Sequence, residues 1–461
     1  MSAELAPWDL HSVRLPEPWK TTYEIEIASG ANKILTLKLV LAAQQLSGSQ
    51  NLPEPLHNAS LAFSDLINDP SPTILEADDN SAWARFHLNL LSYVSWSGAE
   101  APSVGQIWAL IYAIFTQYPE NEAFRLRLTG TSSVGLATEI LATGIATPRP
   151  RQSRPGHALD PPTDSQVLVS RSAFWQGAAS PFGTRPVWVS HPSLYSHLSK
   201  PLAAYPAYPL EYTVTFSSEG RPVHAQHPVR PPKPPRSATI YSRYIPELDE
   251  FLSMDQLDWQ NESHLQLFNH WQNDPRVSRS WNETGTLEQH REYLRKIDED
   301  AHQMAILARF NGTYFAYFET YWAKLQEDHM GVYISPAPGD WDRGRHSLVG
   351  DVRYRGPDRA SIWWTCLIHY LFLDDPRTTT VVGEPNYSNE KVLSYDMANG
   401  FHIHKLADLP HKRSAIMRCE RIRFFQTATF ALKGANAKAS LLKARKTRRQ
   451  ARAKEKIQAK L

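Results

Sequence analysis

The stretch Arg353-Tyr354-Arg355-Gly356-Pro357-Asp358-Arg359-Ala360 is the part of the sequence that decides the fold of the second half of the chain. It follows a short strand predicted over Ser347–Asp351 and opens an apolar helix predicted over Ala360–Leu373. Backbone N–H groups at such a strand–loop–helix junction point outward, and the helix dipole favours an anion there. The three arginines of the stretch add charge that suits a pyrophosphate. A solvated turn with basic residues is the alternative.

Residues 240–430, which surround this junction, alternate between helical and strand patterns. The predicted helices are His264–Asn273, Leu287–Asp298, Ala360–Leu373 and Asn389–Asn399. The predicted strands are Gln303–Phe310, Tyr314–Trp322, Ser347–Asp351, Thr379–Glu384, Phe401–Leu406 and Ala415–Arg421. Asn311-Gly312 between the first two strands is a hairpin signal. This order predicts a mixed α/β sandwich with a partly antiparallel sheet.

The first half of the chain also carries mixed α and β patterns, with helices predicted over Trp83–Trp96 and Val104–Tyr118 and a strand over Pro186–Val189. Six of the sixteen residues in Arg221–Arg236 are proline, so this segment is expected to be extended and semi-rigid. We therefore expect a domain over 1–220, a Pro-rich linker over 221–239, a second domain over 240–430 and a basic tail over 431–461.

Length and composition limit the class of protein. A chain of 461 residues is too long for one ordinary domain, and 42% hydrophobic with 21% charged residues excludes a disordered or collagen-like chain. Two cysteines, Cys366 and Cys419, cannot form a disulfide scaffold or a four-cysteine zinc site, which favours a reducing compartment. No secretory signal is recognised at Met1–Glu4, and the apolar stretch Ile107–Phe115 is about half of what a bilayer needs. A soluble protein is expected.

The junction also resembles a known motif. Arg353, Gly356 and Ala360 match the acyl-CoA pyrophosphate loop of the GCN5-related N-acetyltransferases, although Asp358 stands where that pattern has a glycine. Further matching segments are YSRYIPEL (241–248), WQNDPRV (271–277), HREYL (290–294), YFETYWAK (317–324), GDWDRGRHSLVGD (339–351), Glu384-Pro385-Asn386, Asn389 and Gly400-Phe401. Together, over about 240–425, they look like the siderophore acyltransferases, and most like the fungal hydroxyornithine transacylases.

This resemblance implies a fold and a reaction. The fold is α/β, with two acetyltransferase-like domains in tandem, and the first copy is degenerate because residues 1–220 contain no pyrophosphate loop. The reaction is transfer of an acyl group, with anhydromevalonyl as the expected group, to N5-hydroxyornithine, which gives a hydroxamate for a fusarinine-type siderophore. Acetyl transfer in a ferrichrome-type pathway, a general amine acetyltransferase and a non-catalytic scaffold are the alternatives. Asp358 and Asn386 favour the scaffold.

The resemblance also assigns catalytic residues. His346 is the expected base, and a histidine of ordinary pKa is sufficient because an N-hydroxylamine is largely neutral near pH 7. Asn386 replaces a family aspartate and can position a group but cannot act as a base. Asp396 is expected to act as an acid or to orient another group. The alternatives are a surface-strand histidine for His346 and an exposed helix residue for Asp396.

Acyl-CoA is the expected co-substrate, and no metal is expected. The residues expected to bind it are Ser347 and Leu348 through backbone N–H, Arg353, Arg355, Gly356, Arg359, Ala360 and Asn389. The residues expected to contact hydroxyornithine are Trp281, Glu319, Tyr321, Trp322 and Asp328. The space beside Trp281 and Trp322 is expected to distinguish an acetyl from a branched five-carbon acyl group. A homodimer is left open.

The tail over 431–461 contains seven Lys, four Arg and one Glu, which gives +10, so the remaining residues carry 2 − 10 = −8. No aromatic residue is interleaved with these charges, so nucleic acid is not an expected partner. A membrane is not an expected partner either, because the apolar stretch named above is too short. A solvated amphipathic helix is the structural alternative. Ala459-Lys460-Leu461 resembles the Ser-Lys-Leu peroxisomal address, which predicts recognition by the peroxisomal import receptor and a peroxisomal localisation.

Overall fold

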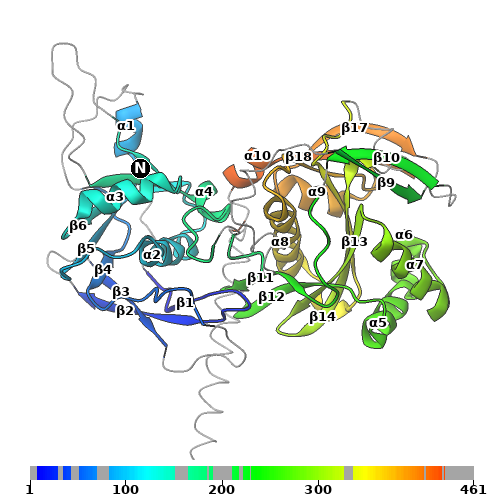
Figure 1. The fold of residues 1–461 in the computed structure, drawn as a ribbon, viewed down its shortest axis with the longest axis horizontal. Helices are drawn as coiled ribbons and strands as arrows, with labels where there is room; N and C mark the ends of the chain where they lie inside the picture. The colour runs from blue at the N-terminus through cyan, green and yellow to red at the C-terminus, as the bar shows by residue number, and fades with distance from the viewer. Residues whose placement is uncertain are drawn as a thin grey trace, which may run out of the picture. The chain divides into compact units, whose positions relative to one another are not determined.

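The computed structural model describes residues 8–29, 35–42, 51–69, 82–150, 165–183, 186–190, 210–216, 222–228, 230–325, 336–409, 412–427 and 430. The chain divides into two compact units, Met1–Val187 and Trp188–Leu461. Each unit contains an eight-stranded sheet with helices beside it (Figure 1).

The sheet of the first unit has the strand order β1-β2-β3-β4-β5-β6-β8-β7. The strands are β1 (Ser12–Arg14), β2 (Thr22–Ser29), β3 (Leu35–Leu41), β4 (Leu61–Ser64), β5 (Leu91–Trp96), β6 (Ala123–Thr129), β7 (Ala146–Pro148) and β8 (Gln166–Ser170). The helices are α1 (Ala82–His87), α2 (Val104–Gln117), α3 (Ser133–Ala142) and α4 (Arg171–Trp175). Neighbouring strands are antiparallel except β5 and β6, which are parallel.

The sheet of the second unit has the order β11-β12-β13-β14-β15-β16-β18-β17. The strands are β11 (Thr239–Ile245), β12 (Glu250–Gln256), β13 (Gln303–Phe310), β14 (Thr313–Trp322), β15 (Arg343–Val349), β16 (Thr380–Gly383), β17 (His402–Leu409) and β18 (Lys412–Glu420). The helices are α5 (Glu262–Gln272), α6 (Pro275–Trp281), α7 (Leu287–Glu299), α8 (Pro357–Asp374), α9 (Glu390–Ala398) and α10 (Arg421–Gln426), with short 3-10 turns at Ala323–Leu325 and Val352–Tyr354.

The two units repeat one topology. In each, the first five strands are antiparallel, and the fifth pairs in parallel with the sixth, β5 with β6 and β15 with β16. Two further antiparallel strands complete each sheet. In each, a long helix lies between the strands of the parallel pair in the sequence, namely α2 and α8. The first unit has no counterpart of α5–α7, because β2 ends at Ser29 and β3 begins at Leu35. The tandem α/β fold with a reduced first copy is therefore confirmed.

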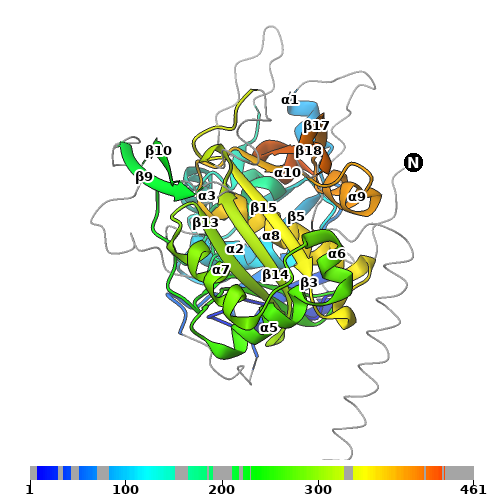
Figure 2. The same ribbon diagram turned by 90° about the vertical axis from the view of Figure 1, so that its right-hand side faces the viewer.

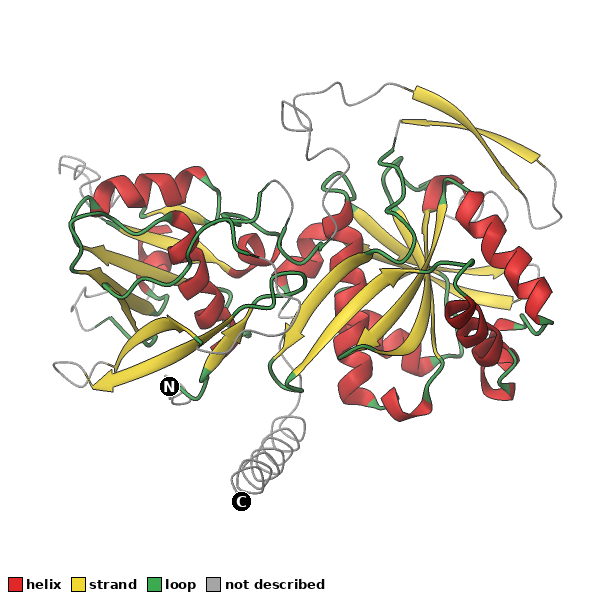
Figure 3. Cartoon of the chain, turned by 60° about the horizontal axis from the view of Figure 1, so that its bottom comes forward, coloured by secondary structure: helices red, strands yellow, loops and turns green. Residues whose placement is uncertain are grey.

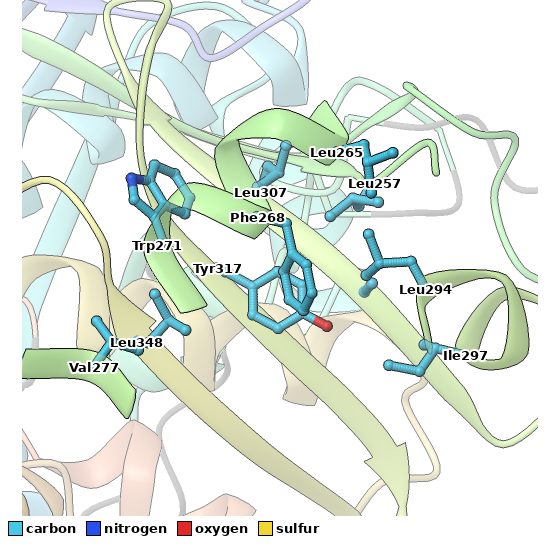
Figure 4. Packing of buried hydrophobic residues seen from close by; sticks show 11 residues of the cluster. Leu257, Leu265, Phe268, Trp271, Val277, Leu294, Ile297, Leu307, Tyr317 and Leu348 are labelled. Carbon is cyan, nitrogen blue, oxygen red and sulfur yellow. The ribbon is translucent and has the colours of Figure 1, made fainter. Parts of the chain in front are cut away.

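One face of the second sheet is covered by α5, α6 and α7. Figure 2 shows these helices in front of β13–β15, with α8 behind the strands. Figure 4 shows the cluster that joins them, in which Phe268 of α5 lies on Tyr317 of β14. On the opposite face Phe318 stacks on Trp363 of α8 with ring centroids 5.3 Å apart. Each large apolar side chain buried in this way contributes about 1.5–3 kcal/mol.

Local sequence explains where these elements begin. α7 begins with a capping box, in which the Thr286 hydroxyl accepts from the backbone N–H of Gln289 while the Gln289 side chain accepts from the N–H of Thr286. α8 begins with Pro357 in its first turn, where the missing N–H costs nothing. Both sheets are visible in Figure 3 as yellow strands flanked by red helices.

Several predicted elements have different bounds. The helix predicted over Trp83–Trp96 is wrong in its second half, because α1 ends at His87 and residues 91–96 form β5. The Asn89 side chain donates to the Arg85 carbonyl and closes the helix, after which LSYVSW alternates between the two faces of a strand. The strand predicted over Pro186–Val189 is a turn. β15 spans Arg343–Val349 and so begins before the predicted strand.

The division between the units falls earlier than the sequence-based boundary at residue 220. Trp188 is fully buried, and its ring lies 6.4 Å from that of His369 in α8, so it belongs to the second unit. Part of the predicted linker forms β10 (Pro222–Pro228), which pairs with β9 (Leu210–Phe216) in a separate two-stranded sheet. The tail over 431–461 lies outside the described residues. None of the helices in the described ranges has the length and apolar character needed to span a membrane.

Candidate active site

The parallel pairing of β15 with β16 stops after two residues. Arg343 pairs with Val381 and Gly344 with Val382, whereas β15 continues to Val349 and remains paired with β14 on its other side. Beyond Gly344, therefore, the ladder places no β16 residue beside the edge of β15. An unpaired strand edge in the middle of a sheet exposes backbone groups to a ligand.

The ladder also fixes which amides face this open edge. The Gly350 N–H donates to the Phe315 carbonyl of β14. Because amide directions alternate along a strand, the N–H of Leu348 also points to β14 and the N–H of Ser347 points to the open edge. Of the two amides predicted to hold a thioester oxygen, Ser347 has the required direction and Leu348 is committed to the sheet.

His346 lies at this edge between two carboxylates. Its Nδ1 is 2.9 Å from Glu319 Oε2 of β14, directly opposite in the ladder, and its Nε2 is 3.0 Å from Glu384 Oε1. Glu384 follows the last residue of β16. The side chains of Glu319 and Glu384 are 7% and 6% exposed, whereas that of His346 is 31% exposed, so the imidazole is the accessible member.

Each carboxylate is held by further donors. Glu319 Oε1 accepts from the hydroxyls of Tyr293 at 2.6 Å and Tyr317 at 2.9 Å. Glu384 Oε2 accepts from the Tyr321 hydroxyl at 3.2 Å, and its Oε1 lies 3.6 Å from Lys412 Nζ. These donors keep both carboxylates fixed in position and compensate for their burial.

Electrostatics make His346 unusually basic. Burial alone would lower its pKa, but the charge of Glu384 and the hydrogen bonds with both carboxylates outweigh this effect and raise the pKa to about 10. Burial would likewise raise the pKa values of Glu319 and Glu384, but His346 holds the first below and the second well below its usual range. Sequence reasoning supplied no partners for the ring and therefore did not indicate this raised pKa.

Aromatic side chains surround the imidazole. The ring of Tyr321 lies 5.1 Å and that of Trp281, at the end of α6, lies 6.1 Å from the ring of His346. Trp281 also contacts Tyr317 at 5.9 Å. Of the residues predicted to contact substrate, Trp281, Tyr321 and Glu319 are thus brought to His346. The Glu319 oxygens already meet His346 and two tyrosines, which differs from the predicted free partner for an amino group.

The predicted pyrophosphate loop forms the N-terminus of α8. Gly356 has φ +120°, a conformation that strongly favours glycine, and Ala360 donates its N–H to the Gly356 carbonyl. Arg355 is exposed, and among the described residues no ion pair or hydrogen bond holds its side chain. Arg353 pairs with Asp351, and Arg359 forms two hydrogen bonds with Glu250 of β12. Two of the three arginines are thus already neutralised, which sequence alone did not indicate.

Asp396 is fully buried, in contrast to the exposed helix residue considered as its alternative. Its Oδ1 accepts from Arg345 of β15 and, at 2.8 Å, from Trp364 Nε1 of α8. Burial raises its pKa, an effect that Arg345 partly offsets. Arg345 precedes His346 and so points to the opposite face of the sheet. Asp396 therefore joins α9 to β15 and α8 beneath the site and does not meet the imidazole, which fits the orienting role rather than the acid.

Other predicted residues lie elsewhere. Trp322 points to the face opposite His346, where its ring lies between the guanidinium groups of Arg230 and Arg343, so the expectation that it lines the acyl pocket is wrong. Asn386 is exposed and accepts from Ser388. Asn389 caps α9, as predicted, by accepting from Val392 N–H. Asp328 and the C-terminal Ala459, Lys460 and Leu461 lie outside the described residues.

Sequence reasoning missed Glu384, Tyr293 and Lys412. Glu384 lies in the motif Glu384-Pro385-Asn386, of which only the third residue was predicted to be functional. Lys412 and Tyr293 come from β18 and α7, and no local pattern relates them to His346. Within the described ranges, no group of His, Cys, Asp and Glu is arranged to hold a metal ion.

Comparison with known proteins identifies the family. An acetyltransferase (GNAT) domain matches residues 260–409. The chain is 58% identical to hydroxyornithine transacylase SID3 of Ajellomyces capsulatus, over 93% of this chain and 96% of that protein. This chain belongs to the hydroxyornithine transacylase family.

Two further relatives of the transacylase span most of its length. It is 47% identical to the N(5)-hydroxyornithine:cis-anhydromevalonyl coenzyme A-N(5)-transacylase SIDF of Beauveria bassiana, over 92% of this chain and 94% of that protein. It is 44% identical to a putative O-acetyltransferase, SAT14, of Stachybotrys chartarum, over 90% and 92% of the two chains. The transacylase is thus an N-acyltransferase with a GNAT domain in its second unit.

Proposed function

We propose that this transacylase moves the anhydromevalonyl group from coenzyme A to the hydroxylated N5 of N5-hydroxyornithine. The product is a hydroxamate, a bidentate oxygen ligand that suits ferric iron, and this chemistry supports a role in siderophore biosynthesis. The names of the two relatives above support the acceptor, and the name of the Beauveria bassiana protein supports the donor.

The open edge of β15 beside His346 is the observation that carries this proposal. A thioester lying along that edge meets the outward N–H of Ser347, which is suited to hold the carbonyl oxygen as it gains charge. The N-terminus of α8 and the exposed Arg355 are suited to the diphosphate of coenzyme A. Asp358, in the first turn of α8, is partly exposed. Because its carboxylate cannot donate to an anion, we expect the backbone amides to be the main ligands of the diphosphate.

The chemistry is direct transfer without a covalent enzyme intermediate. The neutral hydroxylamine nitrogen attacks the thioester carbon, and the carbonyl pair of electrons moves to oxygen. The nitrogen loses its proton, the C–S bond breaks, and coenzyme A leaves as a thiol. Trp281 and Tyr321 beside His346 provide the apolar wall against which the acyl chain is expected to lie.

Product mass spectrometry tests this function. Purified transacylase is given N5-hydroxyornithine with equal amounts of acetyl-CoA and anhydromevalonyl-CoA. We expect the anhydromevalonyl hydroxamate to dominate. A dominant acetyl product would overturn the donor assignment, and the absence of any hydroxamate would overturn the function.

The coenzyme A site is tested with a matched pair of glycine variants. Gly356→Ala should raise the KM for acyl-CoA at least tenfold, because alanine is strained at φ +120° and the α8 terminus must shift. Gly135→Ala, in α3 of the first unit, has nothing within 4 Å of the added carbon and should leave KM unchanged. An equal KM in both variants would place the diphosphate elsewhere.

A further inference from the structure

The positions of the two carboxylates fix the protonation of His346. An ionised carboxylate can accept hydrogen bonds but cannot donate one. Both ring nitrogens of His346 lie at hydrogen-bond distance from a carboxylate oxygen, 2.9 Å for Nδ1 and 3.0 Å for Nε2. Each nitrogen must then carry a hydrogen, so the ring is an imidazolium with no lone pair available to receive a proton.

We propose that Glu319 and Glu384 act as specificity-determining residues, which restrict the transacylase to acceptor nitrogens that are already neutral by keeping His346 from acting as a base. This inference rests on the proposed function. It assigns to the two glutamates the choice between a hydroxylated amine and the corresponding ordinary amine. The electrostatics described above agree with the geometry, since both carboxylates stabilise the charged ring.

Of the groups that face the ring from neighbouring elements, the three tyrosines and Lys412 do not supply another base. Tyr293, Tyr317 and Tyr321 donate to the glutamates, and burial together with these carboxylates raises their pKa values well above the usual one, so they stay protonated. Lys412 of β18 is a cation beside Glu384. Glu283, in the loop after α6, is exposed, and burial together with the charge of Glu319 raises the pKa of its carboxyl group.

The two kinds of acceptor differ in what they require. A hydroxylamine is largely neutral near pH 7, so its lone pair forms the C–N bond at once. In the resulting intermediate the nitrogen is cationic and strongly acidic, and its proton passes to water. The C–S bond then breaks, and the departing thiolate takes a proton from water, which balances the reaction. An ordinary side-chain amine is an ammonium ion at this pH and must lose a proton before it can attack, and His346 cannot receive it.

Glu384→Gln tests the proposal as a gain of activity. The amide has the shape of the carboxylate but no charge, so His346 keeps one carboxylate and the pKa of its ring falls. We expect the ratio of kcat/KM for ornithine to kcat/KM for N5-hydroxyornithine to rise at least tenfold over the wild type. The matched control is Glu288→Gln, an exposed glutamate of α7 with a side chain 82% accessible, which should leave the ratio unchanged. An unchanged ratio in Glu384→Gln would overturn the proposal.

The protonation of His346 can also be measured on the wild-type protein, which does not depend on the folding of that variant. The imidazole ¹⁵N resonances of His346, assigned by their loss in His346→Gln, should report a doubly protonated ring at pH 8. A ring that is neutral at pH 8 would overturn the proposal. Because this measurement needs no turnover, a failure to acylate hydroxyornithine would count against the proposed function alone.

Discussion

The two units share a strand order but differ at the parallel pair. In the first unit β5 and β6 pair at five successive positions, from Leu91 with Arg125 to Ser95 with Thr129. In the second unit β15 and β16 pair at two. The same topology thus gives a closed sheet in one copy and an open strand edge in the other, so the edge and not the topology makes the site.

Side chains explain the closed copy. Trp96, the last residue of β5, packs its ring against Gly130 just after β6 and donates its Nε1–H to the Thr131 carbonyl at 3.2 Å. A Cβ at Gly130 would lie 2.4 Å from that ring, so the approach depends on glycine. The second copy has Glu384 just after β16, and its carboxylate meets His346. The parallel pair thus carries an aromatic ring at its end in the first unit and a carboxylate beside His346 in the second.

Breaking the buried ion pair beneath the site should have the largest effect. Asp396→Asn removes the charge that balances Arg345, whose side chain is 5% exposed, and we expect the second unit to lose about 3–5 kcal/mol of stability. Denaturant unfolding measures it. Asp408→Asn, in an exposed pair with Arg413, is the control and should change stability by less than about 0.5 kcal/mol. Equal losses in the two variants would mean that the buried pair does not hold the second unit together.

Two glycine substitutions, one in each unit, should change stability by smaller amounts and in opposite directions. A Cβ at Gly344 would lie 2.0 Å from the Tyr321 ring, so Gly344→Ala should cost about 1–3 kcal/mol and weaken the Tyr321–Glu384 hydrogen bond. Gly135→Ala lies in an open part of α3 and should stabilise the first unit by about 0.5–1 kcal/mol. Thermal unfolding measures the stability change of both variants. A neutral Gly344→Ala would show that Tyr321 can move without consequence.

Helix caps should give the smallest effects and distinguish stability from activity. α2 and α7 each begin with a capping box, at Ser103 and Thr286, and replacing either residue by alanine should cost about 1 kcal/mol. Thr286→Ala should also lower kcat, because α7 carries Tyr293 to Glu319. Ser103→Ala should leave kcat unchanged. Steady-state kinetics on the two variants measures kcat. Equal kcat values would mean that α7 does not position the groups of the site.

The fold was predictable where local patterns are strong. The long apolar run after Pro357 predicted α8, and Asn311-Gly312 predicted the β13–β14 hairpin, because each signal lies within a few residues. The helix predicted over residues 83–96 was wrong in its second half because a short helix and a strand both place apolar residues at close intervals. The strand of that segment is set by its partners β4 and β6, which are distant in the sequence.

The candidate site was predictable only in part. His346 and Gly356 were found because they lie in motifs. The raised pKa of His346 depends on Glu384, which follows β16. Lys412, which lies beside Glu384, comes from β18. The spacing of Glu384 and Lys412 in the sequence relates neither residue to the ring of His346. Trp322 was misplaced because strand alternation fixes opposite faces for neighbours but does not say which face holds the site.

The order of the strands has a consequence for how the protein acquires activity. β11 to β15 are consecutive in the chain and in the sheet, so they can pair soon after they are made. β16 joins this meander through a crossover of thirty residues, and Glu384 follows directly after β16. A nascent chain that has completed the meander would hold His346 against Glu319 alone. Glu384 can therefore reach the imidazole only when the crossover has brought β16 to the sheet.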